Sequence, residues 1–109
     1  MKFSIGFSPC PNDTFIFDAL VNYGIDTDEL VFDTILEDVE WLNEAALHGK
    51  LDICKVSYAV VPLLAGKYRL LSSGGALGRG VGPLLICRDK KMNVLPEDLP
   101  VALPGRHTT

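Results

Sequence analysis

Short apolar runs alternate with polar turns along this chain, and the spacing predicts strands that alternate with helices. An apolar run over residues 2–7 predicts a buried strand. Alternating apolar and polar residues over 29–36, and a third apolar run over 51–56, predict two more strands. This alternation is typical of a mostly parallel sheet flanked by helices, so we expect an α/β fold.

The segments between these strands carry helix signals. Two prolines end the first strand, and Asn12 or Asp13 can cap a helix over about residues 14–22. Asp38 caps the clearest predicted helix, whose apolar side chains follow helical spacing as far as Gly49.

A third helix is expected after the strand at 51–56. Ser57 stands at the cap position of a segment that continues to about Leu64. Pro62 lies beyond the first-turn positions where a missing N–H is harmless, so this helix is expected to start irregularly.

A glycine-rich segment over 74–82 lies between strands predicted over 68–72 and 83–88. Unhindered backbone N–H groups in such a segment can cradle anionic oxygens. The residue order of a nucleotide-binding P-loop is absent, and Arg79 lies between glycines without a helix start behind it. The segment therefore favours a hinge or a close approach to a ligand over nucleotide binding.

A linker rich in proline and charge over 90–100 precedes a strand and turn that begin at Val101. Few contacts usually cross such a linker. We therefore divide the chain into a first α/β lobe, residues 1–89, and residues 90–109, which lead toward a second lobe absent from this chain.

Composition narrows the function classes. The net charge of −4 comes without a basic stripe, which argues against nucleic acid as a partner. Charged residues, glycine or proline interrupt every apolar run before the roughly 20 residues that a membrane span needs. The start of the chain lacks a secretory signal pattern, so the cytoplasm is the expected location.

The three cysteines are widely spaced, and we expect reduced thiols without a disulfide frame or a zinc site.

Three loops that follow predicted strands carry hydroxyl groups at expected helix N-termini. They cover Ser8–Thr14, Lys55–Ser57 and Arg106–Thr109. Free N–H groups and the helix dipole favour carboxylates and other acceptor-rich ligands there, although Ser and Thr can also serve only as caps. In an open α/β sheet these loops converge on one crevice, so we predict a ligand site at that edge.

The residues alone indicate a binding cleft without a catalyst. His48 precedes Gly49 at a predicted helix end, where a solvated cation is expected. No Ser-His-Asp order, carboxylate pair or metal-ligand cluster can be assembled. The candidate cleft residues are Ser8, Asn12, Asp13, Thr14, Ser73, Gly74, Arg79 and His107.

Ordered motifs span the chain: GFSPCPNDTFIF at 6–17, EDVE at 37–40, KVSY at 55–58, SGGALGRGVGPL at 73–84 and PGRHTT at 104–109. Together they resemble the 1,4-dihydroxy-6-naphthoate synthases of the futalosine route to menaquinone. The resemblance covers essentially the whole chain.

The resemblance implies a lyase with a two-lobed, type II periplasmic-binding-protein fold. Its substrate, cyclic de-hypoxanthinylfutalosine, is expected between the lobes and loses its sugar-derived portion to give 1,4-dihydroxy-6-naphthoate. No metal or redox cofactor is implied. By the family's pattern, the substrate-binding residues are Lys55, Val56, Ser57, Thr108 and Thr109.

The family's proton acceptor is a histidine on the second lobe, downstream of the motif at 104–109. No catalytic residue is therefore expected in this chain, and we predict that residues 1–109 alone are inactive. An uncovered sheet edge and helix-packing surface are expected to cause self-association.

The alternative function is a solute-binding module of the same fold that captures a small acid. A secretory leader would favour that module, whereas a cleft-facing histidine on the second lobe would favour the lyase.

Overall fold

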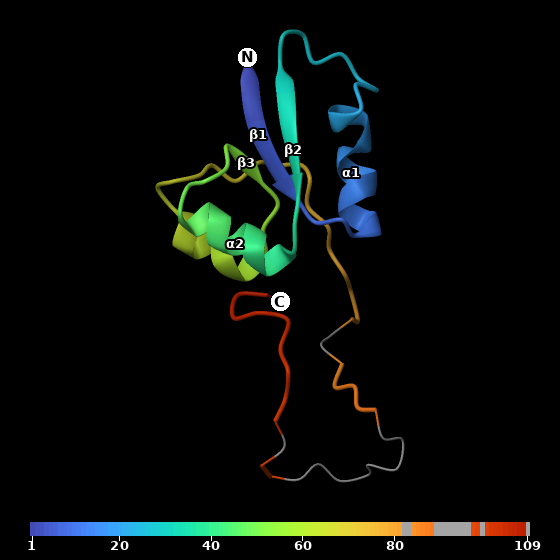
Figure 1. Cartoon of the computed structure of the whole chain (residues 1–109), viewed down its shortest axis with the longest axis vertical. Coiled ribbons are helices and arrows are strands. Elements are labelled where there is room, and N and C mark those ends of the chain that lie inside the picture. The colour runs from blue at the N-terminus through green and yellow to red at the C-terminus, as the bar shows by residue number, and fades with distance from the viewer. Residues whose placement is uncertain (82–83, 89–96, 99, 109) are drawn as a thin grey trace.

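The computed structural model describes residues 1–81, 84–88, 97–98 and 100–108 (Figure 1). Its elements follow in the order β1 (Lys2–Phe7), α1 (Pro11–Val21), β2 (Val31–Leu36), α2 (Val39–Leu47), β3 (Ile53–Cys54) and the 3₁₀ helix η1 (Tyr58–Leu64). This order confirms the predicted alternation of strands and helices. None of the helices in the described ranges combines the length and the apolar character that a bilayer crossing requires.

In the described residues the strands form one parallel three-stranded sheet in the order β2-β1-β3. β1 pairs with β2 along its whole length, from Lys2 opposite Val31 to Phe7 opposite Leu36. β3 pairs with the other side of β1 near its end. Because all three strands run in the same direction, their carboxyl ends lie at one edge of the sheet, as predicted (Figure 1).

Helix α2 packs closely against β1 because Gly6 has no side chain. A Cβ at Gly6 would lie 2.6 Å from Leu51 Cδ1 and 2.8 Å from Leu42 Cδ2. Leu42 is fully buried at this contact. Asp38 caps the helix as predicted, since its side chain accepts a hydrogen bond from the backbone N–H of Glu40 at 2.8 Å.

Helix α1 covers the opposite face of the sheet. Phe7 follows Gly6 in β1, and successive residues of a strand point to opposite faces. The ring of Phe7 lies 4.7 Å from that of Phe17 in α1, measured between centroids. The sheet is therefore sandwiched between the two α-helices.

The start of α1 corrects the prediction. The helix begins at Pro11 rather than near Thr14, because a proline at the first helical position loses no hydrogen bond and already has a helical φ. Cys10 is the N-cap, without a side-chain cap hydrogen bond. Asn12 and Asp13 lie inside the first turn, and Asp13 turns its carboxylate toward the loop after β1.

The third strand and the third helix are less regular than predicted. β3 covers two residues rather than the whole of 51–56. η1 is a 3₁₀ helix, and Ser57 precedes it without a side-chain cap. Pro62 lies inside η1, where its missing N–H cannot complete the hydrogen-bond pattern of an α-helix.

The strands predicted in the second half of the chain do not form in the described residues. Apart from an isolated bridge at Tyr68, the described parts of 68–72, 83–88 and 101–103 are irregular and mostly exposed. A strand needs a neighbour for its backbone hydrogen bonds, and beyond that single bridge these segments pair with none in the described ranges. Most of the linker predicted over 90–100 lies outside the described residues.

Candidate functional site

The loops after β1 and β3 meet at the carboxyl edge of the sheet around a buried acid, Asp13. Asp13 Oδ2 accepts hydrogen bonds from the backbone N–H of Ser8 at 3.2 Å and from Ser8 Oγ at 2.8 Å. Asp13 Oδ1 lies 3.2 Å from Lys55 Nζ. Three residues selected from the sequence, Ser8, Asp13 and Lys55, therefore form one cluster.

This ion pair is shielded from water on the acid side and open on the lysine side. The side chain of Asp13 is 8% exposed and that of Lys55 is 24% exposed. A buried carboxylate is costly unless charge and hydrogen bonds compensate it, and Lys55 and Ser8 supply both. The partly exposed ammonium group can contact an anionic group of a ligand at this edge.

Ser57 is held by Asn43, a fully buried residue of α2. The backbone N–H of Ser57 donates to Asn43 Oδ1 at 2.9 Å, and Asn43 Nδ2 donates to Ser57 Oγ at 3.2 Å. A backbone N–H can only donate, so the first contact fixes which end of the amide is the oxygen. The same Nδ2 also lies 3.4 Å from the carbonyl oxygen of His107. One buried side chain therefore joins two distant loops.

Glu40, one turn before Asn43 on α2, binds the last described segment through its carboxylate. Glu40 Oε1 accepts a hydrogen bond from the backbone N–H of Arg106 at 2.9 Å. Glu40 Oε2 accepts from the backbone N–H of His107 at 3.3 Å and from Thr108 Oγ1 at 3.0 Å. Three donors thus converge on one carboxylate.

The pKa of Glu40 reflects this environment. Desolvation by itself raises the pKa, but hydrogen bonds to the carboxylate outweigh it and leave the pKa below its ordinary value. The largest of these contributions come from the Thr108 hydroxyl and the backbone N–H groups of Arg106 and His107. Glu40 is therefore ionised at neutral pH.

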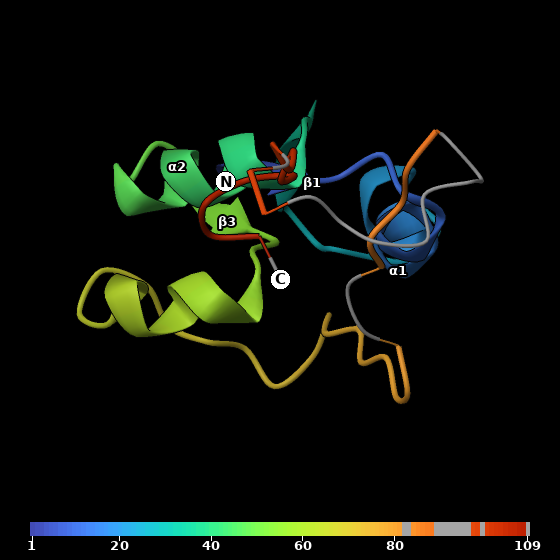
Figure 2. The ribbon, with the colours of Figure 1, turned by 90° about the horizontal axis from the view of Figure 1, so that it is seen from below.

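These contacts bring the predicted substrate loops to one side of α2. Figures 1 and 2 show the C-terminal segment running beside α2, near the carboxyl edge of the sheet. Ser57 and Thr108 both contact residues of this helix. Val56 packs its side chain against the core around Val60 instead. Thr109 lies outside the described residues.

The glycine-rich candidates lie between η1 and α1, since a Cβ at Gly75 would lie 3.1 Å from Tyr58 Oη, and their place in the cleft stays a prediction. Left-handed conformations at Gly74 and Gly80 allow their segment to turn over α1. A Cβ at Gly74 would lie 3.7 Å from Phe17 Cζ. Ser73 and Arg79 are exposed.

Two further candidates, Asn12 and Thr14, lie in the first turn of α1. Asn12 lines an open groove of about 760 Å³ with Phe15 and Leu77. Thr14 Oγ1 donates to the backbone carbonyls of Cys10 at 3.0 Å and Pro11 at 3.2 Å, so it satisfies its own helix. Asp13 therefore makes the contacts of this helix with Ser8 and Lys55, and the place of Asn12 and Thr14 in the cleft stays a prediction.

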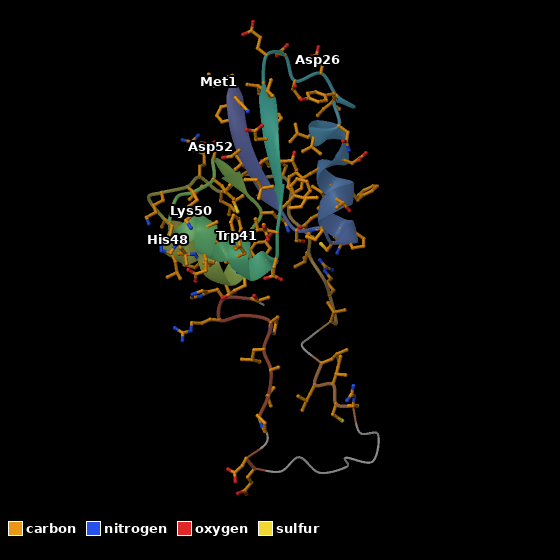
Figure 3. The ribbon with its side chains drawn as sticks, in the orientation of Figure 1. Met1, Asp26, Trp41, His48, Lys50 and Asp52 are labelled. Carbon is orange, nitrogen blue, oxygen red and sulfur yellow. The ribbon has the colours of Figure 1, made fainter. Side chains whose placement is uncertain are left out.

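The two histidines make different kinds of contact with α2. His48 lies at the end of α2, beyond Trp41, and its Nδ1 approaches the backbone oxygen of Glu44 at 2.8 Å (Figure 3). His107 contributes its backbone N–H and carbonyl to the contacts with α2. Burial raises the pKa of Cys54 to about 12, which keeps this thiol protonated. Within the described part of the chain, no group of three or more His, Cys, Asp or Glu could hold a metal ion.

The site offers side-chain groups rather than free backbone donors. We predicted that backbone N–H groups of these loops would bind the ligand, but Asn43 and Glu40 occupy those of Ser57, Arg106 and His107. The side-chain groups that these loops carry beside α2 and Asp13 are the Lys55 ammonium and the hydroxyls of Ser57 and Thr108. Such a set suits a small molecule that carries both an anionic group and hydroxyl groups.

Sequence reasoning missed the two residues that organise the site. Asn43 stands four residues after Val39 and four before Leu47, so it lies on the apolar face of α2. A polar residue on such a face signals a buried hydrogen-bond partner. Glu40 is an acid in the first turn of a helix, a position usually explained by the helix dipole alone.

Known proteins share this sequence. A family model described as menaquinone biosynthesis matches residues 3–109. The 1,4-dihydroxy-6-naphthoate synthase of Thermus thermophilus is 52% identical over 105 residues, and that of Streptomyces coelicolor is 43% identical over 105 residues. Both alignments cover 96% of this chain but only 38% and 36% of the relatives' own lengths.

Proposed function

Because residues 3–109 match that family model, the chain belongs to the menaquinone biosynthesis family, and we propose that it forms the first, substrate-binding lobe of a 1,4-dihydroxy-6-naphthoate synthase. The chain spans 38% of the Thermus relative, so the complete reaction belongs to the longer protein in this proposal. The parallel sheet and its helices are then one half of a two-lobed, type II periplasmic-binding-protein fold.

The proximity of Ser57 and Thr108 to one helix carries the proposal. Asn43 contacts Ser57, and Glu40 contacts Thr108. Both hydroxyl residues belong to motifs that resemble the synthases. A helix that brings these two loops together supports a small-molecule site between them.

The chemistry of the site fits the proposed conversion of cyclic de-hypoxanthinylfutalosine to 1,4-dihydroxy-6-naphthoate. The product is a carboxylate, and Lys55 offers a partly exposed ammonium group for that charge. In this proposal, Ser57 and Thr108 bind the substrate through their hydroxyls. The sugar-derived portion is eliminated, and a histidine on the second lobe accepts the proton.

Turnover of cyclic de-hypoxanthinylfutalosine by the full-length protein, followed by chromatography of the product, tests the proposal. Lys55→Met should lower kcat/KM by about 10- to 100-fold, because a hydrogen bond to a charged group contributes about 1.5–3 kcal/mol. Lys50→Met is the matched control, since it removes an exposed ammonium group beyond the end of α2 (Figure 3). We expect it to change kcat/KM by less than about twofold.

The outcomes separate the two functions. A wild-type protein that binds the compound but forms no product would favour the solute-binding module. A protein that neither binds nor converts it would contradict the proposal. We also expect residues 1–109 alone to be inactive, because the proposed proton acceptor lies outside them, and product formation by this isolated chain would refute that expectation.

A further inference from the structure

We propose that Glu40 and Asn43 form a clamp on α2 that fixes the spacing and the hydrogen-bonding direction of the Ser57 and Thr108 hydroxyls. We call these two residues the α2 clamp. The inference rests on the proposed function, in which both hydroxyls contact the substrate. The clamp residues are positioning residues, because they act on the ligand through the two loops.

The helix that carries the α2 clamp is fixed by its packing in the core. Glu40 and Asn43 are three residues apart on a helix, so their side chains project from neighbouring positions on successive turns. Leu42 lies between them in sequence and is fully buried in a cluster with Leu51. A rotation of α2 would expose Leu42, so the two clamp side chains keep their relative position.

Asn43 determines how Ser57 meets a ligand. It holds the backbone N–H and the hydroxyl oxygen of Ser57 at once, and the whole side chain is buried away from competing water. Because Ser57 Oγ accepts a hydrogen bond from the amide, its own hydrogen is left for another acceptor. Ser57 therefore faces the ligand as a donor, which suits a carboxylate or carbonyl oxygen.

Glu40 gives Thr108 the opposite role. A hydroxyl group has one hydrogen to donate, and Thr108 donates it to Glu40 Oε2 at 3.0 Å. Thr108 therefore faces the ligand as an acceptor, which suits a ligand hydroxyl group. The α2 clamp thus gives the two loops complementary preferences, one for the acidic end of a substrate and one for a hydroxyl-bearing part.

Two further features match the C-terminal segment to the α2 clamp. His107 is held from both sides, since its N–H donates to Glu40 and its carbonyl accepts from Asn43. Gly105 lies directly against the Glu40 carboxylate, which a Cβ at that position would overlap. Three hydrogen-bond donors stabilise the negative charge of the Glu40 carboxylate. This carboxylate can therefore lie beside a site for an anionic ligand.

Steady-state kinetics of the full-length protein with cyclic de-hypoxanthinylfutalosine test the inference. Glu40→Gln keeps the size of the side chain but replaces one acceptor oxygen with an NH₂ donor, so it cannot accept from all three partners. We expect KM to rise about 10-fold while kcat stays within about twofold, the pattern of lost binding rather than lost chemistry. Glu44→Gln, an exposed acid one turn later on α2, is the matched control and should leave KM unchanged.

A double-mutant cycle separates positioning from a merely structural role. If Glu40 acts through Thr108, then Glu40→Gln should raise KM by less than about twofold once Thr108→Val has removed the hydroxyl. Additive effects on KM would overturn the inference. Asn43→Asp keeps an acceptor for the Ser57 N–H but loses the amide donor, and it should raise KM in the same way even if Glu40→Gln fails to fold.

Failure of the α2 clamp is distinguishable from failure of the proposed function. A wild-type protein without turnover counts against the function. If the wild-type protein is active and the Glu40→Gln variant has the same KM as the Glu44→Gln variant, the result counts against the clamp alone.

Discussion

Residues 1–68 and the described residues of 69–108 both carry large apolar side chains, but only the first region buries them within the chain. Leu42 and Val60 are 0% exposed, whereas Leu84 is 83% and Leu103 is 76% exposed. The first region has a sheet and helices that cover each other. The second region has strand-like sequences that form no ladder in the described residues. An apolar pattern thus predicts an element, but a neighbouring surface decides whether that element forms.

One segment of the second region is held in a different way. Residues 105–108 contact α2 through the carboxylate of Glu40 and the amide of Asn43 rather than through apolar packing. Polar contacts of this kind fix the direction of groups but bury little apolar surface. The first region is therefore expected to carry the stability and part of the ligand contacts, whereas residues 105–108 are expected to add ligand contacts with little effect on stability.

The largest expected difference between the regions is in the cost of removing an apolar side chain. Leu42→Ala should lower the free energy of unfolding by about 2–5 kcal/mol, because it leaves a cavity in the core. Leu103→Ala should change it by less than about 0.5 kcal/mol. Urea unfolding of both variants measures the difference. Equal losses of unfolding free energy would contradict the expectation that the first region carries the stability.

A smaller difference is expected for acidic residues. Asp13→Ala should lower the free energy of unfolding by about 1–3 kcal/mol, because the Ser8 donors and the Lys55 ammonium lose their partner. Asp98→Ala, at an exposed position of the second region, is the control and should be close to neutral. The same urea titration gives both values. A neutral Asp13→Ala would show that the cluster at the sheet edge adds nothing to stability.

We expect the isolated 109-residue chain to self-associate through its exposed apolar side chains and the open edge of β2. Replacing Leu84 and Leu103 together with lysine should shift the molar mass measured by light scattering toward that of a monomer. Replacing the exposed Ser72 and Ser73 with lysine adds the same charge at polar positions, so the mass should stay unchanged. A monomeric wild-type chain would contradict the expectation.

The smallest expected effect is on the pH dependence of stability, and it arises from Asp52 in the first region. Hydrogen bonds from the backbone N–H and the hydroxyl of Ser4 lower the pKa of Asp52 below its ordinary 3.8, against a smaller effect of desolvation. A lowered folded-state pKa stabilises the protein above the ordinary pKa, and this contribution is lost as pH falls through the folded value. The urea midpoint should therefore depend on pH less steeply below about pH 4 in Asp52→Asn than in wild type. Equal slopes in the two proteins would show that the Ser4 hydrogen bonds contribute nothing to this pH dependence.

The sequence was most informative where periodicity and an end signal agreed. α2 shows both, since Asp38 caps it and apolar residues repeat at helical spacing, and the structure confirms it. The start of α1 was predicted too late because the helix-starting role of Pro11 was read as a strand-ending role. Strand formation over 68–72 could not be judged from the segment itself, because pairing depends on backbone elsewhere. The division into residues 1–89 and 90–109 remains a prediction.

The position of the site was more predictable than its internal contacts. Parallel strands bring the loops that follow them to one edge, so Lys55 and Ser57 could be selected from their place after a strand. The donors that hold those loops could not be selected in this way. Whether Asn43 reaches Ser57 depends on how deeply α2 packs against β1, and that distance is set by the absence of a side chain at Gly6.

The interval between Glu40 and Asn43 also limits how the length of this sequence can vary. Each residue added to an α-helix rotates the residues that follow by about 100° around its axis. A single insertion between these two residues would rotate one of the side chains away from the loop that it contacts. An added residue in the turn between α1 and β2 would leave the relative positions of both side chains unchanged. Insertions and deletions are therefore expected in that turn and not in the opening turns of α2.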